Sequence, residues 1–139
     1  MAKSFKAYLS ILVIYFVIDL SFQFSIGLNL TRGIYADAGI TDILTKQPGH
    51  AWTIPLFFVA IAYVLLKLAV EPALEKGRAG LAFFNGFLVG FASYGTLALV
   101  CLWLMKDFPV CAAFVYLFEG SVFPTVSSGL TALWLVRRA

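Results

Sequence analysis

A carboxylate in the middle of the first long apolar stretch is the feature that most constrains this chain. Asp19 has apolar residues on both sides of it, from residue 8 to residue 28. At about 1.5 Å per residue, a helix over this stretch is just long enough to cross the ~30 Å hydrocarbon core of a bilayer, with Asp19 near the midplane. A charge at that depth is costly, so we expect the stripe that Asp19 shares with Tyr8, Tyr15 and Gln23 to face other helices instead of lipid.

Composition leaves little room for a water-soluble protein. Of the 139 residues, 62% are hydrophobic and 12% are charged, and the mean hydropathy is +0.95. These values indicate an integral membrane protein. The length suits a single domain, residues 1–139, with about four spans of ~20 residues each. The net charge of +3 comes from basic residues dispersed along the chain, and this pattern does not indicate a nucleic-acid partner.

The sequence predicts an all-α membrane protein with four transmembrane helices. The expected spans are residues 8–28, 51–70, 80–104 and 110–136. No small-residue cleavage pattern follows the first span, so we expect this span to be retained and not removed as a signal peptide. Between the first two spans, residues 29–49 are polar overall but carry apolar residues at helical spacing. This segment predicts a short interfacial helix.

The distribution of Lys and Arg predicts how the spans are oriented. With the N-terminus inside, 7 of the 10 basic residues lie on the cytoplasmic side and 3 lie outside. The inner set is Lys3, Lys6, Lys67, Lys76, Arg78, Arg137 and Arg138, and the outer set is Arg32, Lys46 and Lys106. We therefore expect a multi-pass protein of the bacterial inner membrane with both termini in the cytoplasm. In this orientation Trp52, Trp103 and Trp134 all lie at membrane interfaces.

Small residues in the third and fourth spans predict close helix packing. Ala82, Gly86 and Gly90 recur every four residues, and such a series lets the backbone of another helix approach closely. The fourth span contains Gly120 and Pro124. A proline inside a helix frees a carbonyl and bends the axis, and the neighbouring Ser and Thr hydroxyls are expected to satisfy the freed group.

Three motifs resemble a known family. They are residues 19–35, the segment Val70-Glu71-Pro72-Ala73-Leu74, and Tyr94-x-Thr96 followed by Lys106-x-Phe108-Pro109. This pattern is similar to an uncharacterised family of small four-helix bacterial membrane proteins, domain of unknown function two-one-seven-seven. The resemblance covers nearly the whole chain and implies the four-helix fold, but no established activity. The chain departs from the family pattern in the third and fourth spans, where Ala98, Cys101 and Tyr116 stand at positions expected to be acidic or amide, and the acid is Glu119.

Asp19 and Glu119 form the candidate functional pair. By helical rise, Asp19 lies about 16 Å from the inner boundary at residue 8, and Glu119 about 13 Å from the outer boundary at residue 110, so the two reach similar depths. If they face each other, desolvation and repulsion would make the pair share a proton or take up a cation, as in proton relays. The favoured alternative is that each is a protonated packing group. The hydrogen-bond partners expected in that case are Tyr15, Gln23, Ser93 and Tyr94.

Other chemistry-bearing residues give weaker signals. His50 is the only histidine and has no ligand partners at metal-binding spacing, so we expect no metal site. Cys101 and Cys111 flank the turn between the last two spans. An oxidising compartment could cross-link them, but buried cysteines more often simply fill space.

Two classes of function follow. The favoured one is a non-catalytic accessory or structural subunit that lies in the lipid bilayer and packs against a larger membrane complex or its own copies. The alternative is a small proton- or cation-coupled transporter or channel that uses Asp19 and Glu119. No Ser-His-Asp set or phosphate-binding glycine loop is present, so we expect no enzymatic activity and no cofactor.

Overall fold

The computed structural model describes residues 2–39 and 53–137, and this part of the chain is helical throughout apart from short turns. Its elements follow one another as α1 (Ala2–Phe22), η1 (Gln23–Gly27), α2 (Leu28–Asp37), α3 (Thr53–Leu65), η3 (Leu66–Val70), α4 (Glu71–Glu75), α5 (Ala79–Leu104) and α6 (Val110–Val136). The two η elements are π-helical turns, each inserted between α-helical segments.

The elements join into four apolar helices that are long enough to cross a membrane. These helices are Lys3–Asp37, Pro55–Glu75, Ala79–Leu104 and Val110–Val136. Their length and composition confirm the predicted all-α fold with four transmembrane helices.

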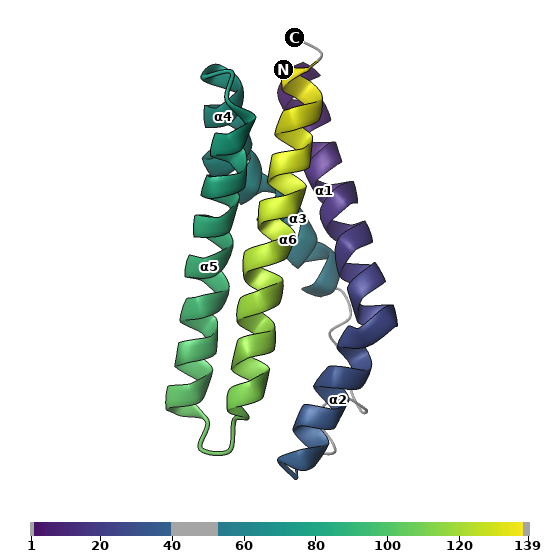
Figure 1. Ribbon diagram of the computed structural model, residues 1–139, viewed down its shortest axis with the longest axis vertical. Coiled ribbons are helices and arrows are strands. Elements are labelled where there is room, and N and C mark those ends of the chain that lie inside the picture. Colours follow the sequence, from purple (N-terminus) through teal and green to yellow (C-terminus); the bar gives the residue numbers. More distant parts are fainter. Residues whose placement is uncertain (1, 40–52, 138–139) are drawn as a thin grey trace.

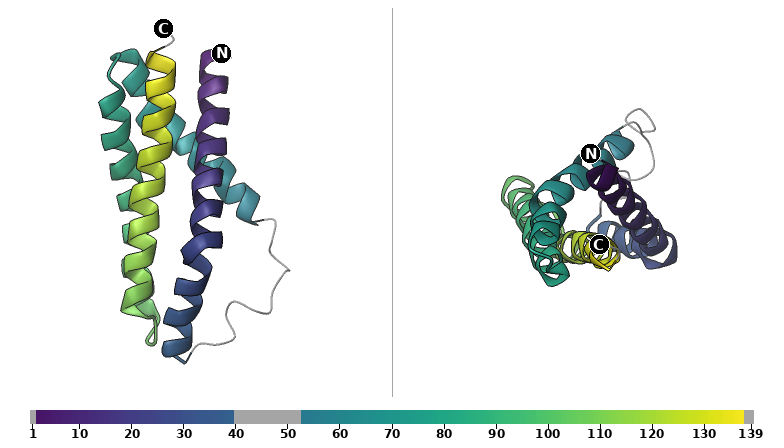
Figure 2. Two further views of the ribbon diagram at one scale, coloured as in Figure 1. Left: turned by 45° about the vertical axis from the view of Figure 1, so that its right-hand side comes forward. Right: turned by 90° about the horizontal axis from the view of Figure 1, so that it is seen from above.

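Helix α6 lies between the other helices. It pairs with α5 along nearly its whole length, and α1 packs on another side of it (Figures 1 and 2). Both chain termini lie at one end of the bundle, which we call the terminal end (Figure 1). The α5–α6 turn and the last residues of α2 lie at the opposite end, which we call the hairpin end.

A separate interfacial helix after the first span is not confirmed. Residues Leu28–Asp37 are helical, but they continue the first helix through η1 and do not form an element of their own. The first helix is therefore longer than predicted. The rest of the predicted interfacial segment lies outside the described residues, together with Lys46, His50, Trp52 and Arg138.

The second span also runs further than predicted, because Pro72 does not end it. Pro72 has no N–H to bond the carbonyl of Leu68 four residues earlier. The Nδ2 amide of Asn85 on α5 donates to that carbonyl instead, at 3.0 Å. The preceding turn, η3, is loosened so that the N–H of Glu71 bonds the carbonyl of Leu66. The predicted connection over residues 71–79 is therefore helical as far as Glu75, and the chain turns at Gly77, which has a φ of +61°.

Small residues bring α5 and α6 into backbone contact, as the sequence predicts. Ala82, Gly86 and Gly90 are all buried. A Cβ on Gly86 would overlap with the hydroxyl of Ser128, and a Cβ on Gly90 would overlap with the carbonyl oxygen of Gly120. Direct contact of this kind is a principal source of helix association in lipid, where both phases are apolar.

Pro124 explains why a carbonyl of α6 is available at this contact. It cannot donate to the carbonyl of Gly120, and that oxygen points toward Gly90 on α5. The Thr125 hydroxyl bonds the carbonyl of Ser121 at 2.5 Å. This hydroxyl bonds the neighbouring carbonyl and not the one that Pro124 frees, so the predicted compensation of the Gly120 carbonyl by a hydroxyl is not confirmed.

The Ser128 hydroxyl links the two helices directly. It lies 2.9 Å from the carbonyl of Ala82 on α5 and 2.6 Å from the carbonyl of Pro124 on its own helix. A buried serine therefore holds α5 and α6 together near the terminal end.

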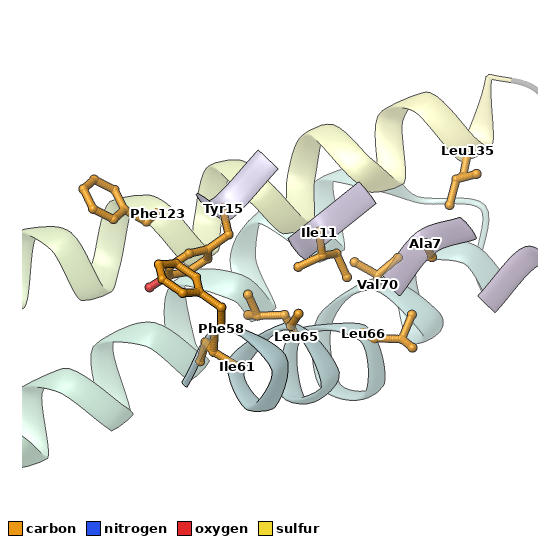
Figure 3. Packing of buried hydrophobic residues seen from close by; sticks show 11 residues of the cluster. Ala7, Ile11, Tyr15, Phe58, Ile61, Leu65, Leu66, Val70, Phe123 and Leu135 are labelled. Atoms are coloured by element: carbon orange, nitrogen blue, oxygen red, sulfur yellow. The ribbon is translucent and has the colours of Figure 1, made fainter. Parts of the chain in front are cut away.

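The terminal half of the bundle contains a large apolar cluster. Buried side chains from α1, α3, η3 and α6 form it (Figure 3). The cluster includes Ala7, Ile11, Leu65, Val70 and Leu135, all buried.

A first prediction tests the α5–α6 contact. Gly90→Ala should lower the stability of the protein by about 1–3 kcal/mol, because its Cβ has no space beside the Gly120 carbonyl. Gly80→Ala is the matched control, since no atom lies within 4 Å of its Cβ position, and it should raise stability by about 0.5–1 kcal/mol. Thermal unfolding in mild detergent measures both. A Gly90→Ala protein as stable as the parent would contradict the contact.

Candidate functional site

One row of side chains on the first helix changes from apolar to polar halfway along. Residues at four-residue intervals from Ala7 to Tyr35 are all buried or half-buried. The row consists of Ala7, Ile11, Tyr15, Asp19, Gln23, Gly27, Thr31 and Tyr35. Its first two members belong to the apolar core, whereas the members that follow carry hydroxyl, carboxyl or amide groups, with Gly27 as the exception.

Asp19 and Glu119 meet in the interior, as their depths predict, and Gln23 lies between them. Gln23 Nε2 donates to Glu119 Oε1 at 3.3 Å, across the α1–α6 contact. Asp19 lies four residues earlier on the same face of the first helix, where its carboxyl interacts with the Gln23 side chain. The two carboxyls are close enough for their charges to interact, and Glu119 is only 9% exposed. Two acids and an amide therefore form one connected group inside the membrane-spanning region.

Two tyrosines close this group on the terminal side. The hydroxyls of Tyr15 on α1 and Tyr94 on α5 lie 3.1 Å apart, and both interact electrostatically with the two carboxyls. Tyr94 reaches this position because its Cβ and ring rest directly on Gly120. The predicted packing residues therefore also position the polar ones, and a side chain on residue 120 would displace Tyr94.

The turn η1 and Gly27 set the position of the Gln23 side chain. Gln23 is the first residue of η1, and a Cβ on Gly27 would overlap with Gln23 Oε1 and with the ring of Phe22. The glycine leaves the space into which the amide folds. π-Helical turns inside α-helices are often found at functional sites.

A second tyrosine pair lies closer to the hairpin end, and sequence reasoning missed it. The hydroxyls of Tyr35 on α2 and Tyr116 on α6 lie 2.9 Å apart. Phe108 packs on both rings, with its centroid 6.3 Å from that of Tyr35 and 6.1 Å from that of Tyr116. Tyr116 also interacts electrostatically with Glu119, three residues further along α6. The four-residue row from Asp19 to Tyr35 is the sequence signal that could have revealed this pair.

Ser93 does not join the polar group, contrary to prediction. Its side chain is exposed, and its hydroxyl bonds the carbonyl of Val89 on its own helix at 2.8 Å. Tyr94 is the next residue and points about 100° around the helix axis from Ser93, so the rotation of α5 decides which of the two neighbours enters the interior. The other predicted members of the site, Asp19, Glu119, Tyr15, Gln23 and Tyr94, are brought together.

The remaining candidates stay apart from this group. Cys101 and Cys111 are both free thiols, the first half-buried and the second exposed. Within residues 2–39 and 53–137, no cluster of three His, Cys, Asp or Glu side chains could hold a metal ion.

The helices around the acidic pair offer no positive charge to balance it. Residues 10–31, 79–105 and 110–136 contain no Lys or Arg. In a medium of low dielectric constant, two adjacent carboxylates without a counter-charge are strongly disfavoured. The group Asp19, Gln23 and Glu119 can therefore accommodate a proton or a small cation, and its oxygen atoms suit either.

Four apolar helices that enclose a buried acidic group define a multi-pass membrane protein. The chain matches the family described as "Predicted membrane protein (DUF2177)" over residues 4–133, and it belongs to that family. The family description identifies a membrane protein and specifies no activity. Neither a curated protein nor a solved structure matches the chain.

A second prediction measures the hydrogen bond between Tyr15 and Tyr94. In a double-mutant cycle of Tyr15→Phe and Tyr94→Phe, we expect a coupling free energy of about 0.6 kcal/mol, typical of hydrogen bonds between membrane helices. Tyr63→Phe serves as the control, because Tyr63 is 56% exposed on α3 and should show no coupling to Tyr94. Equilibrium unfolding in mixed micelles gives the four stabilities. Additive single-variant effects would show that the two hydroxyls do not interact.

Proposed function

We propose that this multi-pass membrane protein is a small transporter or channel that binds and releases a proton or a small cation at Asp19, Gln23 and Glu119. The observation that carries the proposal is the contact of Gln23 Nε2 with Glu119 Oε1 at 3.3 Å beside Asp19, which lies one helical turn before Gln23 and interacts with both side chains. An ionisable group inside a membrane span is a functional candidate by default, and here two such groups share one partner.

The charge balance of the site supports this proposal. Each carboxyl can hold a proton, and the pair together can hold one cation in place of protons. Because no Lys or Arg lies on the stretches that surround the pair, uptake of a positive charge is the way to stabilise it in its ionised form. Release of that charge restores the starting state, which is the elementary cycle of a coupled transporter.

Hydrogen bonding alone could also explain a polar group at this depth. In that case the carboxyls act only as neutral partners of Gln23, and amides at their positions would serve equally well. The two roles differ in one respect, because a coupled transporter needs the carboxyls to ionise and a packing contact does not.

A third prediction separates these roles. In proteoliposomes driven by a pH or cation gradient, Asp19→Asn and Glu119→Gln should each reduce proton or cation flux by about tenfold or more, because an amide cannot alternate between charged and neutral states. Glu75→Gln changes an exposed carboxyl at the terminal end and should leave the flux unchanged. Thermal unfolding of each variant reports whether the fold survives.

Equal flux in the parent and both amide variants would overturn the transport proposal. Absence of flux in all three, together with a stable partner that co-purifies unchanged, would favour the second candidate function.

That second candidate is an accessory or structural subunit that packs against a larger membrane complex or against its own copies. A groove of about 330 Å³ between α1 and α6 favours it. The groove is lined by Leu9, Ser10, Val13, Ile14, Thr131 and Trp134. The Thr131 hydroxyl is fully buried at this groove and has no hydrogen-bond partner within the described part of the chain. An apolar groove of this kind suits the packing of a neighbouring transmembrane helix.

We further propose that the protein lies in the bacterial inner membrane with the terminal end in the cytoplasm. The excess of Lys and Arg at that end supports this orientation, since positively charged loops are retained inside.

A fourth prediction tests the orientation with reporter fusions. A fusion after Arg78 should report a cytoplasmic location, and one after Lys106, in the α5–α6 turn, should report the opposite side. A phosphatase that is active only outside and a fluorescent protein that folds only inside give complementary readouts. The reverse pattern at both sites would contradict the proposed orientation.

A further inference from the structure

We infer that the acidic group exchanges protons with only one side of the membrane, the hairpin end, and that the hydroxyls of Tyr116 and Tyr35 form the path. This inference rests on the proposed function. It adds the side of the membrane from which protons arrive, and it assigns a role to two tyrosines that the proposed function does not require.

The first observation is the asymmetric row on the first helix. From Asp19 toward the hairpin end it presents Gln23, Thr31 and Tyr35, with the small residue Gly27 between them. From Tyr15 toward the terminal end it presents only Ile11 and Ala7. Along this row, hydroxyl and amide groups therefore continue from the acids toward the hairpin end, whereas toward the terminal end they stop at Tyr15. The buried hydroxyls of Ser127, Ser128 and Thr131 lie on α6 and not on this row.

The second observation is the contact across the helices on the hairpin side. Tyr35 and Tyr116 share a hydrogen bond of 2.9 Å that joins α2 to α6. Tyr116 and Glu119 are three residues apart on one face of α6, and they interact electrostatically. The hydroxyls and the carboxyl thus form one series between Tyr35 and the acidic group.

The third observation is the seal on the terminal side. Ile11, Leu65 and Val70 are each 0% exposed, and they pack together immediately beyond Tyr15 (Figure 3). None of these side chains can donate or accept a proton. A proton that left the acidic group in this direction would have to cross a closely packed hydrocarbon layer, which is strongly unfavourable.

The titratable groups that interact with Glu119 come from three elements. They are Asp19 and Tyr15 from α1, Tyr94 from α5, and Tyr116 from α6 itself, and Tyr116 interacts in turn with Tyr35 from α2 and Cys101 from α5. The described side chains of α3 that approach the site are Phe57 and Phe58. Among these groups, the tyrosines that lie between Glu119 and the hairpin end are Tyr116 and Tyr35.

Proton transfer along this route conserves charge on each tyrosine. Tyr116 gives its hydroxyl proton to the Glu119 carboxylate and receives one from Tyr35, and Tyr35 receives one from a hydronium ion at the hairpin end, which is left as water. One O–H bond breaks and one forms at each hydroxyl, so both tyrosines finish neutral and Glu119 gains one proton. Phe108 packs on both rings and limits how freely water reaches them.

A fifth prediction tests the path in full-length protein in phospholipid nanodiscs. Protons released by a light flash are followed by time-resolved infrared absorption of protonated carboxyls, and the band lost in Glu119→Gln identifies that residue. Tyr35→Phe and Tyr116→Phe should slow its protonation by about tenfold or more, because each removes one hydroxyl from the series. Tyr8→Phe is the matched control, since its hydroxyl bonds the Val59 carbonyl on the terminal side. It should leave the rate unchanged.

Phe108→Ala provides an independent variant of opposite sign. Removing the ring that covers the two tyrosines should speed protonation of Glu119, and this result does not depend on the Tyr variants folding. Unchanged rates in the Tyr variants or in Phe108→Ala, or an equal slowing in Tyr8→Phe, would overturn the path while leaving the proposed function intact. A parent protein without any carboxyl band that responds to protons would overturn the proposed function, and the path with it.

Discussion

Glycine backbones hold α5 against α6, and the polar group in the interior depends on that contact. Lipid tails are as apolar as the helix surfaces, so burial gives no net gain here and close backbone packing must supply the association energy. Gly90 packs against the Gly120 carbonyl, which has no donor because Pro124 lacks an N–H. The Tyr94 ring packs directly on Gly120. The small residues that hold α5 against α6 therefore also place Tyr94 beside the carboxyls of Asp19 and Glu119.

Much of this fold can be predicted from the sequence, because hydropathy and the spacing of small residues are local signals. The four helices, the buried series from Ala82 to Gly90 and the shared depth of Asp19 and Glu119 follow from counting residues. The rotation of a helix about its axis is harder to predict from sequence. Ser93 and Tyr94 point about 100° apart on α5, and only Tyr94 enters the interior. The Tyr35–Tyr116 bond spans 81 positions, so the four-residue row places Tyr35 on the interior face but does not identify its partner.

The two candidate functions use different surfaces of α1 and are compatible in one molecule. Sequence reasoning favours a packing subunit because it cannot establish that the two acids meet. The bridging position of Gln23 gives the transport proposal its physical basis, whereas the groove beside Thr131 keeps a partner helix as a candidate. A subunit that contributes a proton-binding group to a larger assembly would use both.

The π-helical turn at residues 23–27 has a consequence for how this family can vary. It accommodates one residue more than an α-helical turn, and loss of that residue would rotate everything before it by about 100° relative to everything after it. Asp19 would then turn away from Glu119 while Tyr35 stayed beside Tyr116. Phe24, Ser25 and Ile26 are exposed and free to change in identity. Between Gln23 and Gly27, the number of residues in this turn therefore matters more to the site than their chemistry, because a change in length would rotate Asp19 away from Glu119.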